Sequence, residues 1–320
     1  MVVCRASLFS IAAGSNGPSP RCHHGICQSG GKIYVVSGED GEGVLDDVWA
    51  LDTSTGLWQE IVPVNPHDFC GRQGCTCCVI DGKLFVIGGG DLLTHHVGAV
   101  LDLHSLVWTD LALHGVFGHK PDARQHHACA VVAGGLVVHG GFNGVQHLGD
   151  TWLLDASTFA WRQLHRDGAA PPCSNHCLVS LDDFTLLRVG GEASSHASTV
   201  LGQPLIIDIR GDGSWCERPI AGIPPAPLSD CSAGCLTAAD GARRLCLFGG
   251  WGDGAAASRC LVVDTTAWTA AEAAVKSAAH VEVNRLGAGP LQEAGGDMLL
   301  FGGWDGMFQW ANTLLSLKLF

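Results

Sequence analysis

Residues 136–155 read LVVHGGFNGVQHLGDTWLLD, and this stretch contains the pattern that decides the fold. A short apolar run ends at the pair Gly140-Gly141, a polar loop follows, and a second apolar run ends at Asp155. Both runs are rich in Val and Leu, which is typical of strands that are buried on both faces. Trp161 follows shortly after Asp155, where a further strand is expected to begin.

The same order of features recurs along the chain at intervals of 50 to 59 residues. Six apolar runs end in a small-residue pair: Ser37-Gly38, Gly88-Gly89, Gly140-Gly141, Gly190-Gly191, Gly249-Gly250 and Gly302-Gly303. After each of the first five pairs, a strand ends in an aspartate: Asp52, Asp102, Asp155, Asp208 and Asp264. A tryptophan follows each aspartate: Trp58, Trp108, Trp161, Trp215 and Trp268. A period of this length indicates structural units that stack on one another.

Each recurrent residue type has a physical reason to be there. A glycine pair ends a strand where the backbone turns or passes so close to a neighbour that a Cβ atom would obstruct it. An aspartate followed by Ser or Thr favours a tight turn, because its carboxylate accepts backbone hydrogen bonds. The tryptophan offers a large apolar surface for packing between neighbouring sheets. Each unit is therefore expected to be a four-stranded antiparallel sheet.

With these features together, the sequence resembles the kelch repeat family. The resemblance covers essentially the whole chain and implies an all-β fold, a six-bladed β-propeller of four-stranded antiparallel blades. The departures are small: Ser37 replaces a glycine, the fourth copy is stretched around residues 194–204, and Tyr34 is the only tyrosine. The dipeptide Trp304-Asp305 follows a glycine pair instead of ending a strand, so it does not indicate a WD repeat.

The repeats predict one propeller domain over residues 1–320. The expected blades are residues 21–62, 72–112, 124–165, 174–219, 231–272, and 285–320 together with 1–11. The sixth copy stops before an outermost strand, while the N-terminus offers an unassigned apolar stretch. We therefore expect residues near 2–11 to pair with residues near 312–319 and close the last blade, since closure leaves no sheet edge exposed.

Composition excludes several classes of protein. Of 320 residues, 47% are apolar and 15% are charged, so the chain has enough apolar residues for a substantial core. The net charge of -13 argues against binding nucleic acid through charge, and no apolar run is long enough to span a bilayer. The fifteen cysteines are an odd number, and many lie inside apolar runs, so we expect reduced thiols instead of disulfides or a zinc site. A cytoplasmic location is expected, with an organellar transit peptide as the alternative.

The resemblance implies that partners bind the face formed by the loops before each innermost strand and between the second and third strands. Five aromatic residues in these loops are candidate anchors for a partner: Phe142, Trp251, Trp304, Phe308 and Trp310. The alternative is that they pack against a neighbouring blade.

Recurrent arginines are a second candidate for this face. Arg21, Arg72 and Arg124 each lie sixteen residues before the first residue of their pair, and Arg285 has a similar register. They either form a positive collar that suits a carboxylate or an acidic peptide, or hydrogen bond to loop carbonyls as structural residues.

Sixteen histidines also raise the possibility of a metal site. Histidines precede several innermost strands, at His23-His24, His126-His127 and His176, and others lie in loops, at His95-His96, His147 and His196. The iron-binding spacing Glu-x-x-x-Asp-x-x-x-His of the kelch-type nitrile-specifier proteins is absent from the sequence. Copper chemistry like that of galactose oxidase needs tyrosine ligands, and this chain has one tyrosine. We therefore expect no metal and no cofactor.

These observations favour a non-enzymatic, monomeric interaction module that presents its loop face to a protein or peptide, with a substrate-recognition or adaptor subunit as one such role. The alternative is a metal-dependent or small-molecule enzyme, similar to the nitrile-specifier proteins, that acts at the mouth of the central channel. No nucleophile elbow, phosphate-binding loop or dinucleotide-binding motif supports the alternative. Both functions occur on propellers, so the fold by itself does not decide between them.

Overall fold

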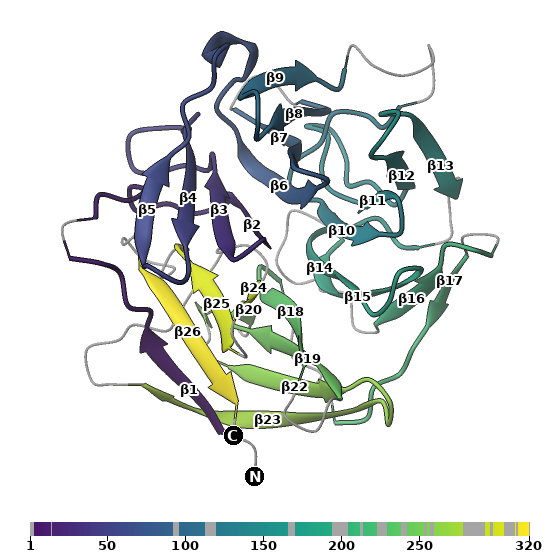
Figure 1. Cartoon of the computed structure of the whole chain (residues 1–320). Coiled ribbons are helices and arrows are strands. Elements are labelled where there is room, and N and C mark those ends of the chain that lie inside the picture. Colours follow the sequence, from purple (N-terminus) through teal and green to yellow (C-terminus); the bar gives the residue numbers. More distant parts are fainter. Residues whose placement is uncertain are drawn as a thin grey trace.

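A computed structural model shows six four-stranded blades arranged around a central axis (Figure 1). It describes residues 3–13, 15–91, 96–112, 120–165, 170–193, 204–211, 214–222, 229–237, 242–252, 255–256, 259–277, 292–294, 297–303, 311 and 313–319. The all-β architecture and the propeller predicted from the sequence are confirmed. Within the described residues, no helix is long and apolar enough to cross a membrane.

The first four blades each use four consecutive strands, with the innermost strand first in the chain. The first blade contains β2 (Gly25–Ser29), β3 (Lys32–Val36), β4 (Val48–Asp52) and β5 (Leu57–Glu60). The second contains β6 (Gln73–Ile80), β7 (Lys83–Gly90), β8 (Gly98–Asp102) and β9 (Val107–Asp110), and a short 3-10 turn, η1 (Pro66–Asp68), precedes it. The third contains β10 (Ala128–Val132), β11 (Gly135–His139), β12 (Thr151–Asp155) and β13 (Trp161–His165). The fourth contains β14 (Ser174–Ser180), β15 (Thr185–Glu192), β16 (Leu205–Asp208) and β17 (Trp215–Glu217).

The last two blades are joined in one eight-stranded sheet. The fifth blade contains β18 (Ser232–Thr237), β19 (Arg243–Phe248), β22 (Cys260–Asp264) and β23 (Thr269–Ser277), with a small hairpin of β20 (Trp251–Gly252) and β21 (Ala255–Ala256) between its second and third strands. The sixth contains β24 (Gln292–Ala294), β25 (Asp297–Phe301), β26 (Leu314–Leu319) and the N-terminal strand β1 (Val3–Leu8).

The N-terminal strand closes the ring. β1 runs antiparallel to β26, with Cys4 opposite Leu319 and Leu8 opposite Leu315, so the closure predicted from the sequence is confirmed. Figure 1 shows β1 beside β26. β1 also pairs in parallel with β23, the outermost strand of the fifth blade. This second pairing, which the repeats did not predict, joins the last two blades through their backbones.

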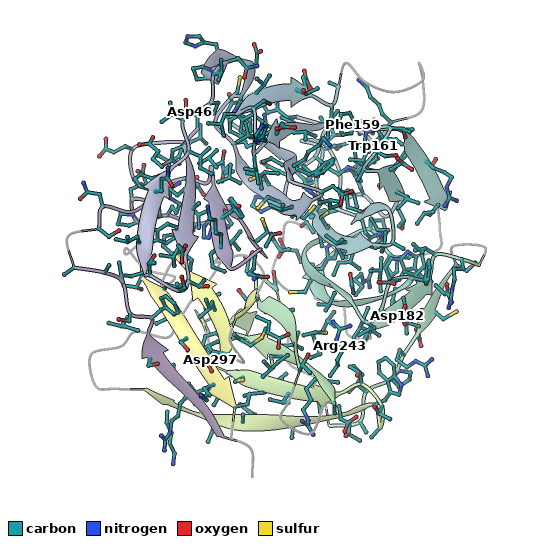
Figure 2. All side chains as sticks on the ribbon, viewed as in Figure 1. Asp46, Phe159, Trp161, Asp182, Arg243 and Asp297 are labelled. Carbon is teal, nitrogen blue, oxygen red and sulfur yellow. The ribbon has the colours of Figure 1, made fainter. Side chains whose placement is uncertain are left out.

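Within the part of the chain that the structure describes, the core forms six apolar clusters, one at each interface between adjacent blades. At the interface of the second and third blades, Phe85 contacts the ring of Phe159 and shares a cluster with the buried Trp161. Figure 2 shows Phe159 and Trp161 side by side in the third blade. The other recurrent tryptophans, Trp58, Trp108, Trp215 and Trp268, likewise pack toward the preceding blade. The predicted role of these tryptophans between sheets is therefore confirmed.

The small-residue pairs are required by the backbone. Both members of each pair have a positive φ, including Ser37 at 58°. At Gly141 (φ 100°), an added Cβ would lie 2.8 Å from the carbonyl oxygen of Gln125. The N–H group of Gly141 donates to the carbonyl of Cys173 in the next blade at 2.7 Å, and Gly303 donates to Arg21 at 2.8 Å across the ring closure. The pairs therefore connect one blade to the next at close range.

Ring closure through β1 predicts a large effect of one buried charge. Ala6 lies opposite Leu317 and belongs to the cluster between the fifth and sixth blades, whereas the neighbouring Ser7 is exposed. We expect Ala6→Glu to lower the free energy of unfolding by about 3 kcal/mol, because the strand would bury an unpaired carboxylate. Ser7→Glu is the matched control and should change the stability little. Equal thermal midpoints for the two variants would contradict the closure.

Candidate functional site

Arg21 is a buried structural residue. Its guanidinium donates to the carbonyl of Ser37 at 3.0 Å and to both carboxylate oxygens of Asp47 at 2.5 and 2.8 Å. The same carboxylate accepts a hydrogen bond from the indole nitrogen of Trp49 at 2.7 Å. Arg21 has no exposed surface, so its charge holds the end of the second strand against the start of the third.

The two following arginines occupy the same place in their blades. Arg124 donates to the carbonyl of Gly140 at 3.0 Å and to Asp150 at 2.6 and 2.9 Å. Arg72 lies over the ring of Phe69, 4.4 Å from its centroid. Both side chains are at most 3% exposed. These contacts support the structural role of the arginines. Their guanidinium groups are buried, so they do not form a collar that is exposed to solvent.

In the fourth blade, a guanidinium comes from a different element. Cys173 takes the position of the arginine before the innermost strand, and Arg188 extends from β15 in its place. Arg188 donates to the carbonyl of Pro171 at 3.2 Å and contacts the Cys173 sulfur at 3.6 Å. The spacing of the loop arginines does not indicate Arg188, because Arg188 lies inside a strand.

A ring-shaped series of backbone hydrogen bonds runs around the central axis at or just before the start of the innermost strands. It contains five equivalent residues: His23, Gly74, His126, Asn175 and Asp230. All five have φ values between 52° and 64°. The N–H groups of the second to fifth donate to the carbonyl oxygen of the residue before them in the series, at 2.8 to 3.1 Å. The ring thus fixes five blades relative to one another and turns these residues toward the axis.

The side chains of this ring form what we call the mouth, defined as His23, His126, Asn175 and Asp230. All four are half-buried and line one central cavity. Nδ1 of His23 lies 2.9 Å from Glu39, and its ring meets that of His126 edge-on at 4.9 Å. Asn175 donates to Glu192 at 2.8 Å. Two carboxylates from the ends of second strands therefore stand beside the mouth.

The charges at the mouth influence one another. Burial alone would lower the pKa of His23, but its contacts with Cys22 and Glu39 and the charge of Asp230 raise that pKa well above its ordinary value. Burial and the charge of Glu192 raise the pKa of Asp230, and the charge of His23 opposes this rise. Carboxyl groups outnumber the protonated imidazole at this end of the cavity.

The cavity encloses about 700 Å³, including the space open to solvent at its mouth. Three buried histidines line it, and each has a ring nitrogen without a hydrogen-bond partner: His24, His127 and His176. Burial lowers the pKa of His24 and of His127 to about 3, and the charge of a neighbouring arginine adds to this effect. These imidazoles are therefore neutral at physiological pH.

One buried group of side chains has the donor set of a metal site. The Cys173 sulfur lies 3.7 Å from Nε2 of His139 and 3.4 Å from Nδ1 of His176. The contact from Arg188 to the same sulfur places a positive charge where a cation would bind. Burial also raises the pKa of Cys173 to about 11, which disfavours the thiolate that a metal needs. A second group within reach of one ion is Cys22, His23 and Glu39.

The predicted aromatic anchors are only partly described. Phe142 is half-buried, and its ring lies 5.3 Å from that of His147 in the same loop. Trp251 begins the hairpin strand β20. The remaining candidates lie outside the described residues: Trp304, Phe308, Trp310 and Arg285. Their role at a partner-binding face stays a prediction.

The buried ion pair predicts a measurable cost for losing one partner. Arg124→Met leaves the carboxylate of Asp150 in the interior without its guanidinium, so we expect a loss of about 3 kcal/mol in unfolding free energy. Adding Asp150→Asn should recover part of that loss. The exposed pair Arg210–Asp208 is the control, since Arg210→Met should leave the urea midpoint unchanged. Equal effects at the two sites would contradict the structural role of Arg124.

The buried histidines predict unfolding in mild acid. Histidines in an unfolded chain bind protons below about pH 6.5. The stability from His24, His127 and His139, whose pKa values are about 3, is therefore complete above that pH and lost as the pH falls toward 3. Each of these histidines should lower the free energy of unfolding by about 1.4 kcal/mol per pH unit, so urea midpoints should fall steeply between pH 7 and 5. His24→Leu should reduce the dependence of the urea midpoint on pH by the contribution of one histidine. A midpoint independent of pH in the wild-type protein would contradict the prediction.

Comparison with known proteins agrees with this architecture. The profile of the KLHDC2/KLHL20/DRC7 Kelch-repeats domain matches residues 4–116 and 99–233. An F-box/kelch-repeat protein of Arabidopsis thaliana is 31% identical over 214 residues, which are 61% of this chain and 44% of that protein. Kelch domain-containing protein 10 of Xenopus tropicalis is 32% identical over 141 residues (42% and 34%), and the human protein is 27% identical over 179 residues (54% and 40%). The chain thus matches less than half the length of these relatives. On the profile match and the six blades, the chain belongs to the kelch-repeat family.

Proposed function

We propose that this propeller is a non-enzymatic interaction module that binds a protein or peptide segment at the mouth. The observation that carries the proposal is the ring of half-buried polar side chains over an open cavity. The backbone ring holds these side chains in place, so a partner meets a preorganised surface. Phe142, which follows the pair Gly140-Gly141, is half-buried and would extend the contact.

The charge at the mouth favours a partner with a basic group. Glu39, Glu192 and Asp230 stand around the opening, while the charges of Arg21 and Arg124 are buried and paired with aspartates. The net charge of -13 adds a long-range attraction for cations. A lysine or arginine side chain, or a peptide amino group, would suit this environment. A basic partner of this kind takes the place of the acidic peptide that the spacing of the arginines indicates.

The proposed function extends to a role of the propeller in a larger assembly. One relative combines kelch repeats with an F-box, and this chain matches less than half of that protein. We infer that the propeller serves as the substrate-recognition or adaptor part of such an assembly, in the cytoplasm. The enzyme alternative is less well supported, because in the buried group of His139, Cys173 and His176 the guanidinium of Arg188 contacts the sulfur that would have to bind a cation.

Selection from a phage-displayed library of random peptides tests the proposal. We expect enriched peptides to contain Lys or Arg and to bind more weakly as salt is added. Glu192→Gln should weaken the binding of these peptides roughly tenfold, because it removes a charge at the mouth. The matched control Glu217→Gln alters an exposed residue on the outermost strand of the same blade and should not affect binding. Failure to enrich any peptide, or equal affinity for the two variants, would refute a binding site at the mouth.

A further inference from the structure

Thiols meet in pairs at the interfaces between blades. Within the described residues, four such pairs join adjacent blades: Cys27 with Cys77, Cys78 with Cys129, Cys177 with Cys231, and Cys4 with Cys260. None of these cysteines forms a disulfide in this structure. The paired residues lie on strands of adjacent blades, except Cys231, which directly precedes its strand.

The sulfur atoms of the pair Cys177–Cys231 are in contact. They lie 3.3 Å apart, although 54 residues separate the two cysteines in the sequence. Cys177 belongs to β14, and Cys231 directly precedes β18, so the contact joins the innermost parts of the fourth and fifth blades. A modest movement of the two side chains would bring the sulfurs to the bonding distance of about 2.05 Å.

Access to solvent distinguishes this pair from the others. Both Cys177 and Cys231 line the central cavity, and both are partly exposed. In contrast, Cys4 and Cys260 are at most 2% exposed and do not border the cavity. Cys129 borders the cavity, but its partner Cys78 is buried outside the lining. A small oxidant that enters the mouth would therefore reach both sulfurs of the Cys177–Cys231 pair.

We propose that Cys177 and Cys231 form a modification site at which hydrogen peroxide produces a disulfide between the fourth and fifth blades. One thiolate attacks an oxygen of the peroxide, the O–O bond breaks, and a sulfenic acid and water result. The second thiol then attacks the sulfenic sulfur, the S–O bond breaks, and a second water leaves as the S–S bond forms. Overall, two thiols lose two protons and two electrons, and one peroxide becomes two waters.

The surroundings of Cys177 determine how the rate varies with pH. The contact with Cys231, together with burial, raises the pKa of Cys177. The attacking thiolate is therefore scarce at neutral pH, and the reaction accelerates as the pH rises. The product adds a covalent link beside the mouth, since Cys231 directly follows Asp230.

The test treats reduced, folded protein with hydrogen peroxide, blocks the remaining thiols by alkylation, and identifies linked peptides by mass spectrometry. The exposed Cys70 and Cys216 report that the oxidant has acted. We expect the Cys177–Cys231 linkage to appear before any other and to raise the thermal midpoint by about 5 °C, because it closes a long loop. Dithiothreitol should reverse both changes.

Two variants assign the site. Cys177→Ser should abolish the link and the gain in thermal midpoint, whereas Cys129→Ser, at another cysteine of the cavity, should retain both. Circular dichroism of the reduced variants checks that they fold. The proposal is overturned if Cys70 and Cys216 are oxidised in folded wild-type protein without the Cys177–Cys231 link. It is also overturned if the link forms as readily in urea, because the folded geometry would then be irrelevant.

Discussion

The close approach of one blade's backbone to the next is the constraint on which the rest of this structure depends. Four backbone hydrogen bonds connect five equivalent residues with positive φ, and each bond joins one blade to the next. The small-residue pairs make a second set of such bonds, and one of them crosses from Gly303 to Arg21. Because these bonds fix the spacing of the blades, the apolar clusters between blades and the positions of the buried histidines follow from them.

Much of the fold could be predicted because each blade repeats the same physical requirements. The glycine pairs, the aspartates and the tryptophans are local signals, and every copy reinforces the others. The closing strand was also predictable, since the sixth copy lacked a strand that the N-terminus could supply. The parallel pairing of β1 with β23 was not, because a contact between the outer strands of two blades leaves no periodic trace in the sequence.

The site was harder to predict than the fold. The spacing of Arg21, Arg72 and Arg124 was visible, but burial decides what an arginine does, and spacing does not report burial. The sequence did contain a clue, because Asp47 and Asp150 each stand two residues before a tryptophan that shares the carboxylate. The mouth residues were not recognised as a set. They share a backbone conformation, but only His23 and His126 have the same side chain, so no single residue pattern connects all four.

The position of β1 between β23 and β26 has a consequence for how the molecule assembles. Cys4 pairs with Leu319, so β1 pairs with β26 only after residue 319 has been synthesised. Contacts between such distant residues form slowly, because the chain loses loop-closure entropy before the contacts stabilise it. Until then β1, β23 and β26 all present unpaired edges, which favour association between chains. The pairing of β1 therefore removes these edges and with them a route to aggregation.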